Sequence, residues 1–219
     1  ISLRNFVKTR SVFSMDFVFD DIPGKYDPFN YPAFLASPTE FVTGVTDVVT
    51  GRPVYFGKQP LMADQCRLLR ASAAIPLFSP MVEFRGRLYL DGGTADPIPV
   101  KRALADGCDK VLVVLTQHRE YVKSPTGQPS LYRRAFRDYP QMIRVLDERH
   151  TLYNDTRAWL WELEKTGKAV VVAPSSPLTV SRFEKRRSRL DEAYFLGKRD
   201  VLLSWDALRP FLSSHLPAE

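Results

Sequence analysis

Hydrophobic residues follow two spacings along this chain, one typical of strands and one typical of helices. Two short runs, Lys110 to Leu115 and Lys168 to Ala173, are almost continuously apolar and rich in valine. Such runs are typical of strands buried on both faces, as in a parallel sheet. Helices are predicted before, between and after them, over Pro99 to Asp106, Tyr132 to Gly167 with a break near Arg149-His150, Ser188 to Gly197, and Trp205 to Leu212. This alternation predicts an α/β protein with a largely parallel sheet between helices.

The first half of the chain carries shorter elements. Two extended runs, Glu40 to Val49 and Pro53 to Phe56, flank the turn residues Thr50-Gly51-Arg52 and predict a β-hairpin. A helix is predicted from Met62 to Ala74, ending before Pro76, because the residue before a proline avoids helical angles. The remaining predictions are a helix from Ser14 to Ile22 ended by Pro23-Gly24, a helical turn from Pro32 to Leu35, and a strand from Gly86 to Leu90.

Length and composition indicate one globular domain. A chain of 219 residues can bury one sizeable core, and without an internal repeat or long linker we expect a single domain over residues 1–219. Cys66 and Cys108 fit a reducing compartment. No stretch approaches the length of apolar sequence that crosses a bilayer, and Ile1 to Asn5 lack a signal-peptide pattern. These features favour a cytoplasmic protein, with peripheral contact at a membrane surface as an open alternative.

The chain is basic, with a formal net charge of +6. Such an excess favours contact with an anionic membrane surface or with nucleic acid. Much of it is concentrated in one run around a predicted helix, comprising Arg182, Lys185, Arg186, Arg187 and Arg189. A run of this kind is typical of a solvated helix face, and no nucleic-acid motif accompanies it. We therefore predict no nucleic-acid partner.

The candidate chemistry lies in Leu88 to Gly93, where a short apolar strand runs into Asp91-Gly92-Gly93. In open α/β sheets, ligands and catalytic groups collect at the carboxyl ends of strands. A carboxylate in a partly dry pocket there can accept a proton from a serine hydroxyl. Gly92 and Gly93 permit backbone angles and close approaches that other residues do not. Taken alone, Asp-Gly between extended segments is also a common turn signal.

Three segments together resemble the aspartate half of the patatin-like phospholipase active site: Arg70-Ala71-Ser72-Ala73-Ala74-Ile75-Pro76-Leu77-Phe78, then Gly86 to Gly93, then Asp96-Pro97-Ile98-Pro99-Val100. Thr39 to Phe56 and Pro174 to Arg182 are also similar to a bacterial subgroup of that family. The resemblance implies a three-layer fold and a serine–aspartate dyad that cleaves phospholipids or other fatty-acyl esters, without a metal or organic cofactor. It assigns Asp91 as the catalytic base, and Gly92, Gly93, Ser72 and Pro76 as motif or pocket residues.

The serine half of that site does not occur here, because the chain contains no Gly-x-Ser-x-Gly. The nucleophile elbow, the glycine-rich oxyanion loop and the first strands of the sheet are therefore expected before Ile1. We therefore interpret the chain as a domain that is incomplete at its N-terminal end and inactive in the form given. The alternative is a catalytically inactive α/β module used for binding or as a scaffold.

Other residues have competing interpretations. Ser72 lacks flanking glycines and is expected to pack near the site, and Asp96 is expected to cap the helix after Pro99 or to fix the loop. A Ser-His-Asp triad would need a histidine, for which His118 is the best placed of His118, His150 and His215. The two tryptophans in Arg157 to Leu163 fit a core helix or a lipid interface. The scattered histidines and cysteines show no metal-ligand spacing.

Overall fold

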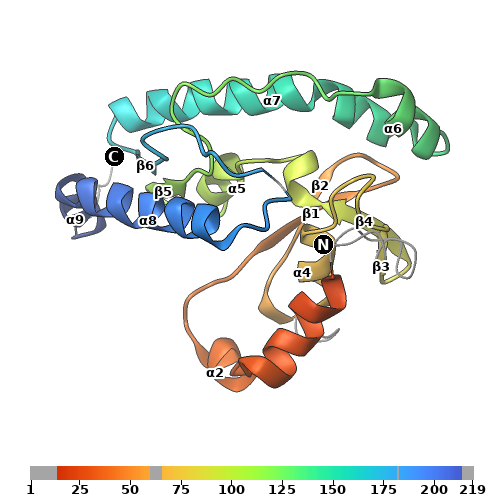
Figure 1. The fold of residues 1–219 in the computed structure, drawn as a ribbon, viewed down its shortest axis with the longest axis horizontal. Helices are drawn as coiled ribbons and strands as arrows, with labels where there is room; N and C mark the ends of the chain where they lie inside the picture. The colour runs from red at the N-terminus through yellow and green to blue at the C-terminus, as the bar shows by residue number, and fades with distance from the viewer. Residues whose placement is uncertain (1–13, 60–65, 182, 214–219) are drawn as a thin grey trace. The chain divides into compact units, whose positions relative to one another are not determined.

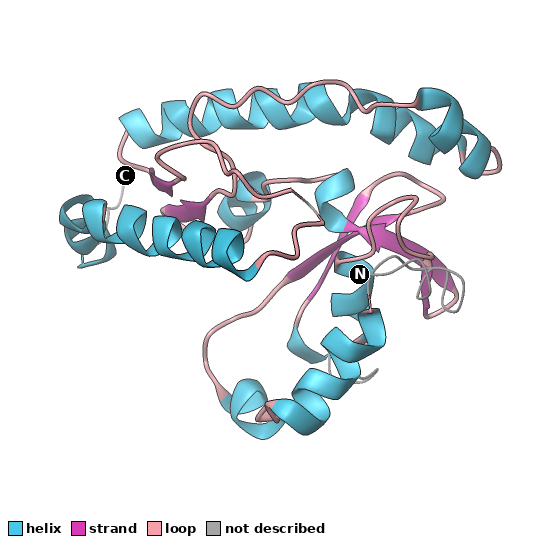
Figure 2. Cartoon of the chain, in the orientation of Figure 1, coloured by secondary structure: helices cyan, strands magenta, loops and turns pink. Residues whose placement is uncertain are grey.

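The computed structural model describes residues 14–59, 66–181 and 183–213, which form helices and strands in two compact units (Figures 1 and 2). Unit 1 comprises Ile1–Ile98 and Ser124–Tyr153, and unit 2 comprises Pro99–Lys123 and Asn154–Glu219. Each unit has its own sheet. The α/β class is confirmed, and the single domain over residues 1–219 stays a prediction.

Unit 1 contains a four-stranded antiparallel sheet in the order β2-β1-β4-β3, formed by β1 (Thr43–Asp47), β2 (Pro53–Phe56), β3 (Val82–Phe84) and β4 (Arg87–Asp91). The predicted hairpin is confirmed, with Thr43 opposite Phe56. The larger of the two sheets is thus antiparallel, which differs from the largely parallel sheet expected. The reason is that short turns join β1 to β2 and β3 to β4, and such turns can join only antiparallel strands.

Two apolar clusters form the core of unit 1. One joins β1, β3, β4 and helix α4 (Arg67–Ser72) through buried residues that include Leu68 and Tyr89. The other joins Leu90 of β4 to helix α6 (Pro129–Ala135) and to the start of helix α7 (Pro140–Lys165), where Met142 is fully buried.

The predicted break near Arg149-His150 is wrong, because α7 runs continuously through these residues. The helices instead separate between Ala135 and Pro140. Pro140 is the first residue of α7. A proline lacks the backbone N–H that a helix interior needs, but the first helical position needs no such donor, so a proline is tolerated there. Neither Arg149 nor His150 interrupts a helix in this way.

Near the start of the described residues lie two short helical segments, the π-helix η1 (Phe17–Tyr26) and helix α2 (Tyr31–Ala36). The helical turn predicted from Pro32 is confirmed, but the expected end at Pro23-Gly24 is wrong. The N–H of Asp27 donates to the carbonyl of Ile22 over 2.8 Å, and this bond spans the Pro-Gly pair. Of the predicted helix from Met62 to Ala74, residues 62–65 lie outside the described residues.

Unit 2 contains the parallel pair of strands, β5 (Val111–Val114) and β6 (Ala169–Val172), with Val111 opposite Ala169. Helix α5 (Val100–Ala105) precedes β5, and α8 (Arg187–Leu203) and α9 (Trp205–Ser213) follow β6. The predicted parallel pairing is confirmed. The prediction that β5 is buried on both faces is wrong, because Leu112 and Val114 are 42% and 69% exposed.

Gly51 provides a test of the packing in unit 1. It has φ +66°, and a Cβ there would lie 2.9 Å from the carbonyl oxygen of Gln141. We expect Gly51→Ala to lower the free energy of unfolding by about 2–4 kcal/mol, because the left-handed backbone costs roughly 1–2 kcal/mol and the contact with α7 adds to it. Urea denaturation measures this change.

The matched control is Gly86→Ala, because Gly86 has φ +73° with nothing within 4 Å of the added Cβ. It should lower the free energy of unfolding only by the roughly 1–2 kcal/mol that a left-handed backbone costs a non-glycine residue. Equal losses in the two variants would contradict the packing of Gly51 against α7.

Candidate functional site

Asp91 is the last residue of β4, and neighbouring segments hold its backbone. It lies opposite Val45 in β1. Its N–H donates to the carbonyl of Ala74 over 2.9 Å, and its own carbonyl accepts the Thr46 hydroxyl over 2.8 Å. The structure therefore brings Ala74, the end of the Ala-Ser-Ala-Ala motif that begins in α4, next to the Asp91-Gly92-Gly93 turn.

The Asp91 side chain is half-buried and caps the short 3₁₀-helix η2 (Gly92–Thr94). Its Oδ1 accepts the N–H of Gly93 over 2.7 Å. The turn interpretation is thus confirmed as one role of this residue. The same hydrogen bond orients the carboxylate, so capping and proton acceptance are compatible roles.

Gly92 lies against the backbone of β1. A Cβ at this position would be 2.3 Å from the carbonyl oxygen of Gly44 and 3.0 Å from the nitrogen of Val45. Both atoms belong to the backbone of a sheet strand and cannot move aside. Only glycine therefore fits after Asp91 without displacing the turn from the sheet.

Two further contacts fix the loop that follows η2. The N–H of Ala95 donates to the hydroxyl of Thr46, which is fully buried. The Tyr55 hydroxyl of β2 donates to the carboxylate of Asp96. The expectation that Asp96 fixes this loop is confirmed, whereas the alternative that it caps the next helix is wrong. The N-cap of α5 is Pro99, which makes no side-chain hydrogen bond because the proline ring has no polar atom to offer.

Arg149 is a site residue that sequence reasoning missed. Its Nε donates to the carbonyl of Gly93 over 2.9 Å. Its Nη2 and the Oδ1 of Asp91 both lie within 4 Å of the point where a Gly93 Cβ would be. A guanidinium therefore lies beside the Asp91 turn. Arg149 belongs to the continuous helix α7. Because the sequence predicted a helix break at this position, it gave no indication that Arg149 contacts the turn.

The remaining motif residues lie on the segment that contacts Asp91. Ser72 is the last residue of α4 and is half-buried, and Pro76 is buried in the turn that follows Ala74. The structure does not test whether either residue contacts a substrate. Both stay predictions.

The histidines are distributed between the units. His118 belongs to unit 2, where its Nδ1 lies 3.1 Å from Glu120 Oε2, while Asp91 belongs to unit 1. His150 lies in α7 with its Nδ1 3.1 Å from the carbonyl oxygen of Asp147. His215 lies outside the described residues. A triad with His118 stays untested.

An ion pair joins the loop after β5 to α7 and β6 within unit 2. Arg119 binds Glu164 through two hydrogen bonds of 2.7 and 2.8 Å, and Glu164 also accepts the N–H of Val171. The hydrogen bond from Arg119 holds the pKa of Glu164 below its usual value, with smaller contributions from the Arg119 charge and the Val171 N–H. The nearby tryptophans, Trp159 and Trp161, are half-buried, and the Arg119 guanidinium lies 4.8 Å from the Trp161 ring centre.

Among residues 14–59, 66–181 and 183–213, no three His, Cys, Asp or Glu side chains come together as metal ligands. In the same part of the chain, no helix combines the length and apolar character that a bilayer crossing requires.

Two family models match the chain. Residues 7–104 match "Patatin-like phospholipase", and residues 139–213 match "Domain of unknown function (DUF6363)". Asp91 lies within the first match.

Curated relatives match over part of their length. "Uncharacterized protein YjjU" from Escherichia coli (strain K12) is 28% identical over 148 residues, which is 67% of this chain and 41% of that protein. "Uncharacterized NTE family protein Mb1092c" from Mycobacterium bovis and "Uncharacterized NTE family protein Rv1063c" from Mycobacterium tuberculosis are each 31% identical over 94 residues, which is 43% of this chain and 25% of each protein. The chain thus spans less than half the length of these relatives.

The close contact of Gly92 generates a stability prediction. Gly92→Ala should lower the free energy of unfolding by about 3 kcal/mol or more, because the added methyl group would overlap the backbone of β1. Gly127→Ala is the control and should change stability by less than about 1 kcal/mol, since nothing lies within 4 Å of its Cβ. Similar urea midpoints for both variants would refute the close contact.

The Arg119–Glu164 pair predicts an acid-dependent loss of stability. Because the pKa of Glu164 is lowered on folding, its contribution is present above the unfolded value of about 4.3 and is lost as the pH falls through the folded value. Glu164→Gln should cost about 1 kcal/mol at pH 7 and should flatten the decline in stability below about pH 4.5. Urea denaturation at a series of pH values measures both effects.

Glu162→Gln is the matched control on the same helix, since Glu162 is 65% exposed and pairs only with the exposed Lys165 among the interactions described. It should retain the acid decline of the unmodified protein. An unchanged acid decline in Glu164→Gln would contradict the role of the Arg119–Glu164 pair.

Proposed function

We propose that this chain is the acid-bearing part of a lipid acyl hydrolase, because residues 7–104 match the patatin-like phospholipase family. Phospholipids or other fatty-acyl esters are the proposed substrates, and Asp91 is the proposed base. The observation that supports this role most directly is the position of Asp91. Its half-buried carboxylate lies at the end of a strand, in a turn that contacts β1, the segment after α4, and Arg149.

The proposed reaction divides ester cleavage into two steps. A serine hydroxyl attacks the ester carbonyl while Asp91 accepts the hydroxyl proton, and an acyl-enzyme forms as the alcohol leaves with that proton. Water then attacks the acyl-enzyme with Asp91 again as proton acceptor, and Asp91 returns that proton to the serine oxygen as the fatty acid leaves. We propose that the serine lies in polypeptide outside these 219 residues, since they contain no Gly-x-Ser-x-Gly.

The surroundings of Asp91 suit this role. The Gly93 N–H fixes one carboxylate oxygen, and Arg149 fixes the Gly93 carbonyl in turn. A base whose orientation is fixed before the substrate binds loses little entropy in the reaction. Arg149 acts in this scheme as a positioning residue, because its guanidinium donates to the turn that carries the carboxylate.

A second candidate function is a binding or scaffold module without catalysis. The absence of a nucleophile elbow from these 219 residues favours it. The two functions differ in activity, because a scaffold would not hydrolyse esters even when expressed from the complete reading frame.

Asp91→Asn tests the proposed base. Asparagine keeps an oxygen that can accept the Gly93 N–H, so the turn should be retained while the basic carboxylate is lost. In the protein expressed from its complete reading frame, we expect hydrolysis of a nitrophenyl fatty-acyl ester to fall at least 100-fold, as typical for loss of a general base. The far-ultraviolet circular dichroism spectrum should be unchanged.

Asp96→Asn is the matched control, because Asp96 is another acid of the same loop and accepts the Tyr55 hydroxyl. It should keep hydrolysis within a few fold of the unmodified protein. Full turnover by Asp91→Asn would exclude Asp91 as the base, and inactivity of the unmodified complete protein would favour the scaffold.

A further inference from the structure

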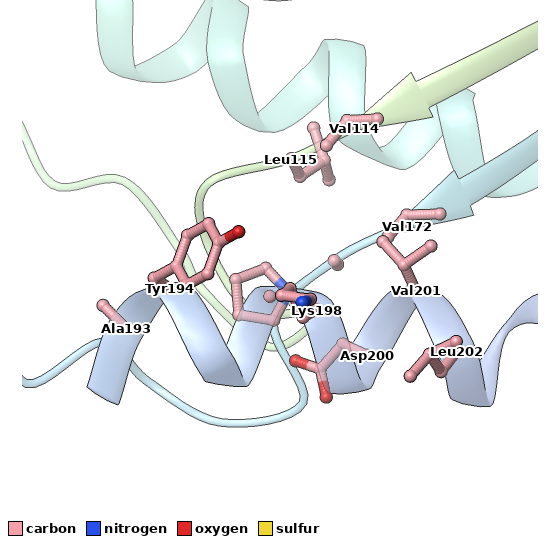
Figure 3. Close-up of a pocket in the computed structure, with 12 residues that line it drawn as sticks. Val114, Leu115, Val172, Ala193, Tyr194, Lys198, Asp200, Val201 and Leu202 are labelled. Atoms are coloured by element: carbon pink, nitrogen blue, oxygen red, sulfur yellow. The ribbon is translucent and has the colours of Figure 1, made fainter. Parts of the chain in front are cut away.

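Unit 2 has an open groove between the ends of its two strands and helix α8 (Figure 3). Its volume is about 580 Å³, within the range of small-molecule sites. One wall is formed by Val114 at the end of β5, by Leu115 directly after it, and by the end of β6. The other wall is α8, where Val201 points toward the strand ends in Figure 3.

Both walls of this groove contain exposed apolar side chains. Val114 is 69% exposed, and Tyr194 and Leu202 of α8 are 62% and 71% exposed. Within α8 only Asp200 is classed as buried. Contiguous exposed apolar surface of this kind marks a binding site in soluble proteins. The apolar character of both walls indicates a ligand with a long hydrocarbon portion.

The groove also carries a positive charge. Lys198 lines it, with its ammonium 5.7 Å from the ring centre of Tyr194. The one acid in the lining, Asp200, accepts the N–H of Ser175 over 2.8 Å and lies 3.6 Å from the Arg199 guanidinium. In Figure 3 the Asp200 carboxylate points away from the strand ends. The charge available to a ligand is therefore that of Lys198, which suits an anionic head group.

We propose that this groove binds a free long-chain fatty acid, with the acyl chain between β5 and α8 and the carboxylate paired with Lys198. The apolar groove suits a single hydrocarbon chain, and its one available cation, Lys198, suits a single negative charge. The choice of a fatty acid over other anionic amphiphiles rests on the proposed function, whose product is a fatty acid. The groove itself contains no residue of the Asp91 site and lies on segments whose later part matches a domain of unknown function.

Displacement of a dansyl-labelled fatty acid from the protein expressed from its complete reading frame tests the proposal. Dodecanoate should displace the probe, and octanoate should do so more weakly, by up to about fourfold per missing methylene. Val114→Asp should weaken dodecanoate binding at least tenfold, because it places a carboxylate in the channel. Val122→Asp is the matched control, since Val122 is 72% exposed outside the groove, and it should bind as the unmodified chain does.

Lys198→Met tests the head-group contact. It should weaken dodecanoate binding several fold and leave dodecan-1-ol binding unchanged, because the alcohol has no charge to lose. Lys185→Met, an exposed lysine outside the groove lining, should alter neither ligand. Binding of dodecanoate that survives both Val114→Asp and Lys198→Met would overturn the proposal.

Other occupants of the groove give different results. A second copy of the chain would appear as a dimer by light scattering, with Val114→Asp restoring the monomer, and that result would also overturn the proposal. Asp91→Asn should bind dodecanoate as tightly as the unmodified chain. Loss of ester hydrolysis in that variant with binding retained separates the two proposals, because each can then fail without the other.

Discussion

The backbone of Gly92 lies against the backbone of Gly44, and the arrangement of the candidate site depends on this contact. It allows β4 to end in a tight turn directly beside β1. The Thr46 hydroxyl then reaches both the Asp91 carbonyl and the Ala95 N–H, so one buried side chain holds the residues on either side of η2. A larger residue at position 92 would separate the turn from the sheet, and these hydrogen bonds would lose their geometry.

Asp91 combines a structural role with the chemistry proposed for it. A carboxylate that caps a turn is fixed in orientation, which is also what a general base requires. Around it, the contacts come from segments far apart in the chain: Ala74 after α4, Thr46 in β1 and Arg149 in α7. These contacts lie within unit 1, so the acid half of the site is organised by that unit alone. The nucleophile is the part that the proposal places elsewhere.

The two units differ in how much apolar surface they cover. In unit 1, Leu90 and Met142 lie in a closed cluster between the sheet and two helices. In unit 2, β5 buries Val111 and Val113 but exposes Leu112 and Val114, and α8 exposes apolar side chains along the groove. This surface is the physical basis of the inferred fatty-acid site. A fatty acid there would cover apolar side chains and neutralise Lys198 in a single binding event.

The sequence by itself determined several local elements and singled out Asp91 as the candidate acid. The valine-rich runs predicted the parallel strands, the Thr50-Gly51-Arg52 turn predicted the hairpin, and the Leu88 to Gly93 motif identified Asp91, because each of these signals is carried by neighbouring residues. Only the tertiary structure decided that the larger sheet is antiparallel, that Arg149 supports the Asp91 turn, that Asp96 binds Tyr55, and that one face of β5 is open. Those features depend on contacts between residues distant in sequence, and the spacing of residues along a chain carries no direct record of such contacts.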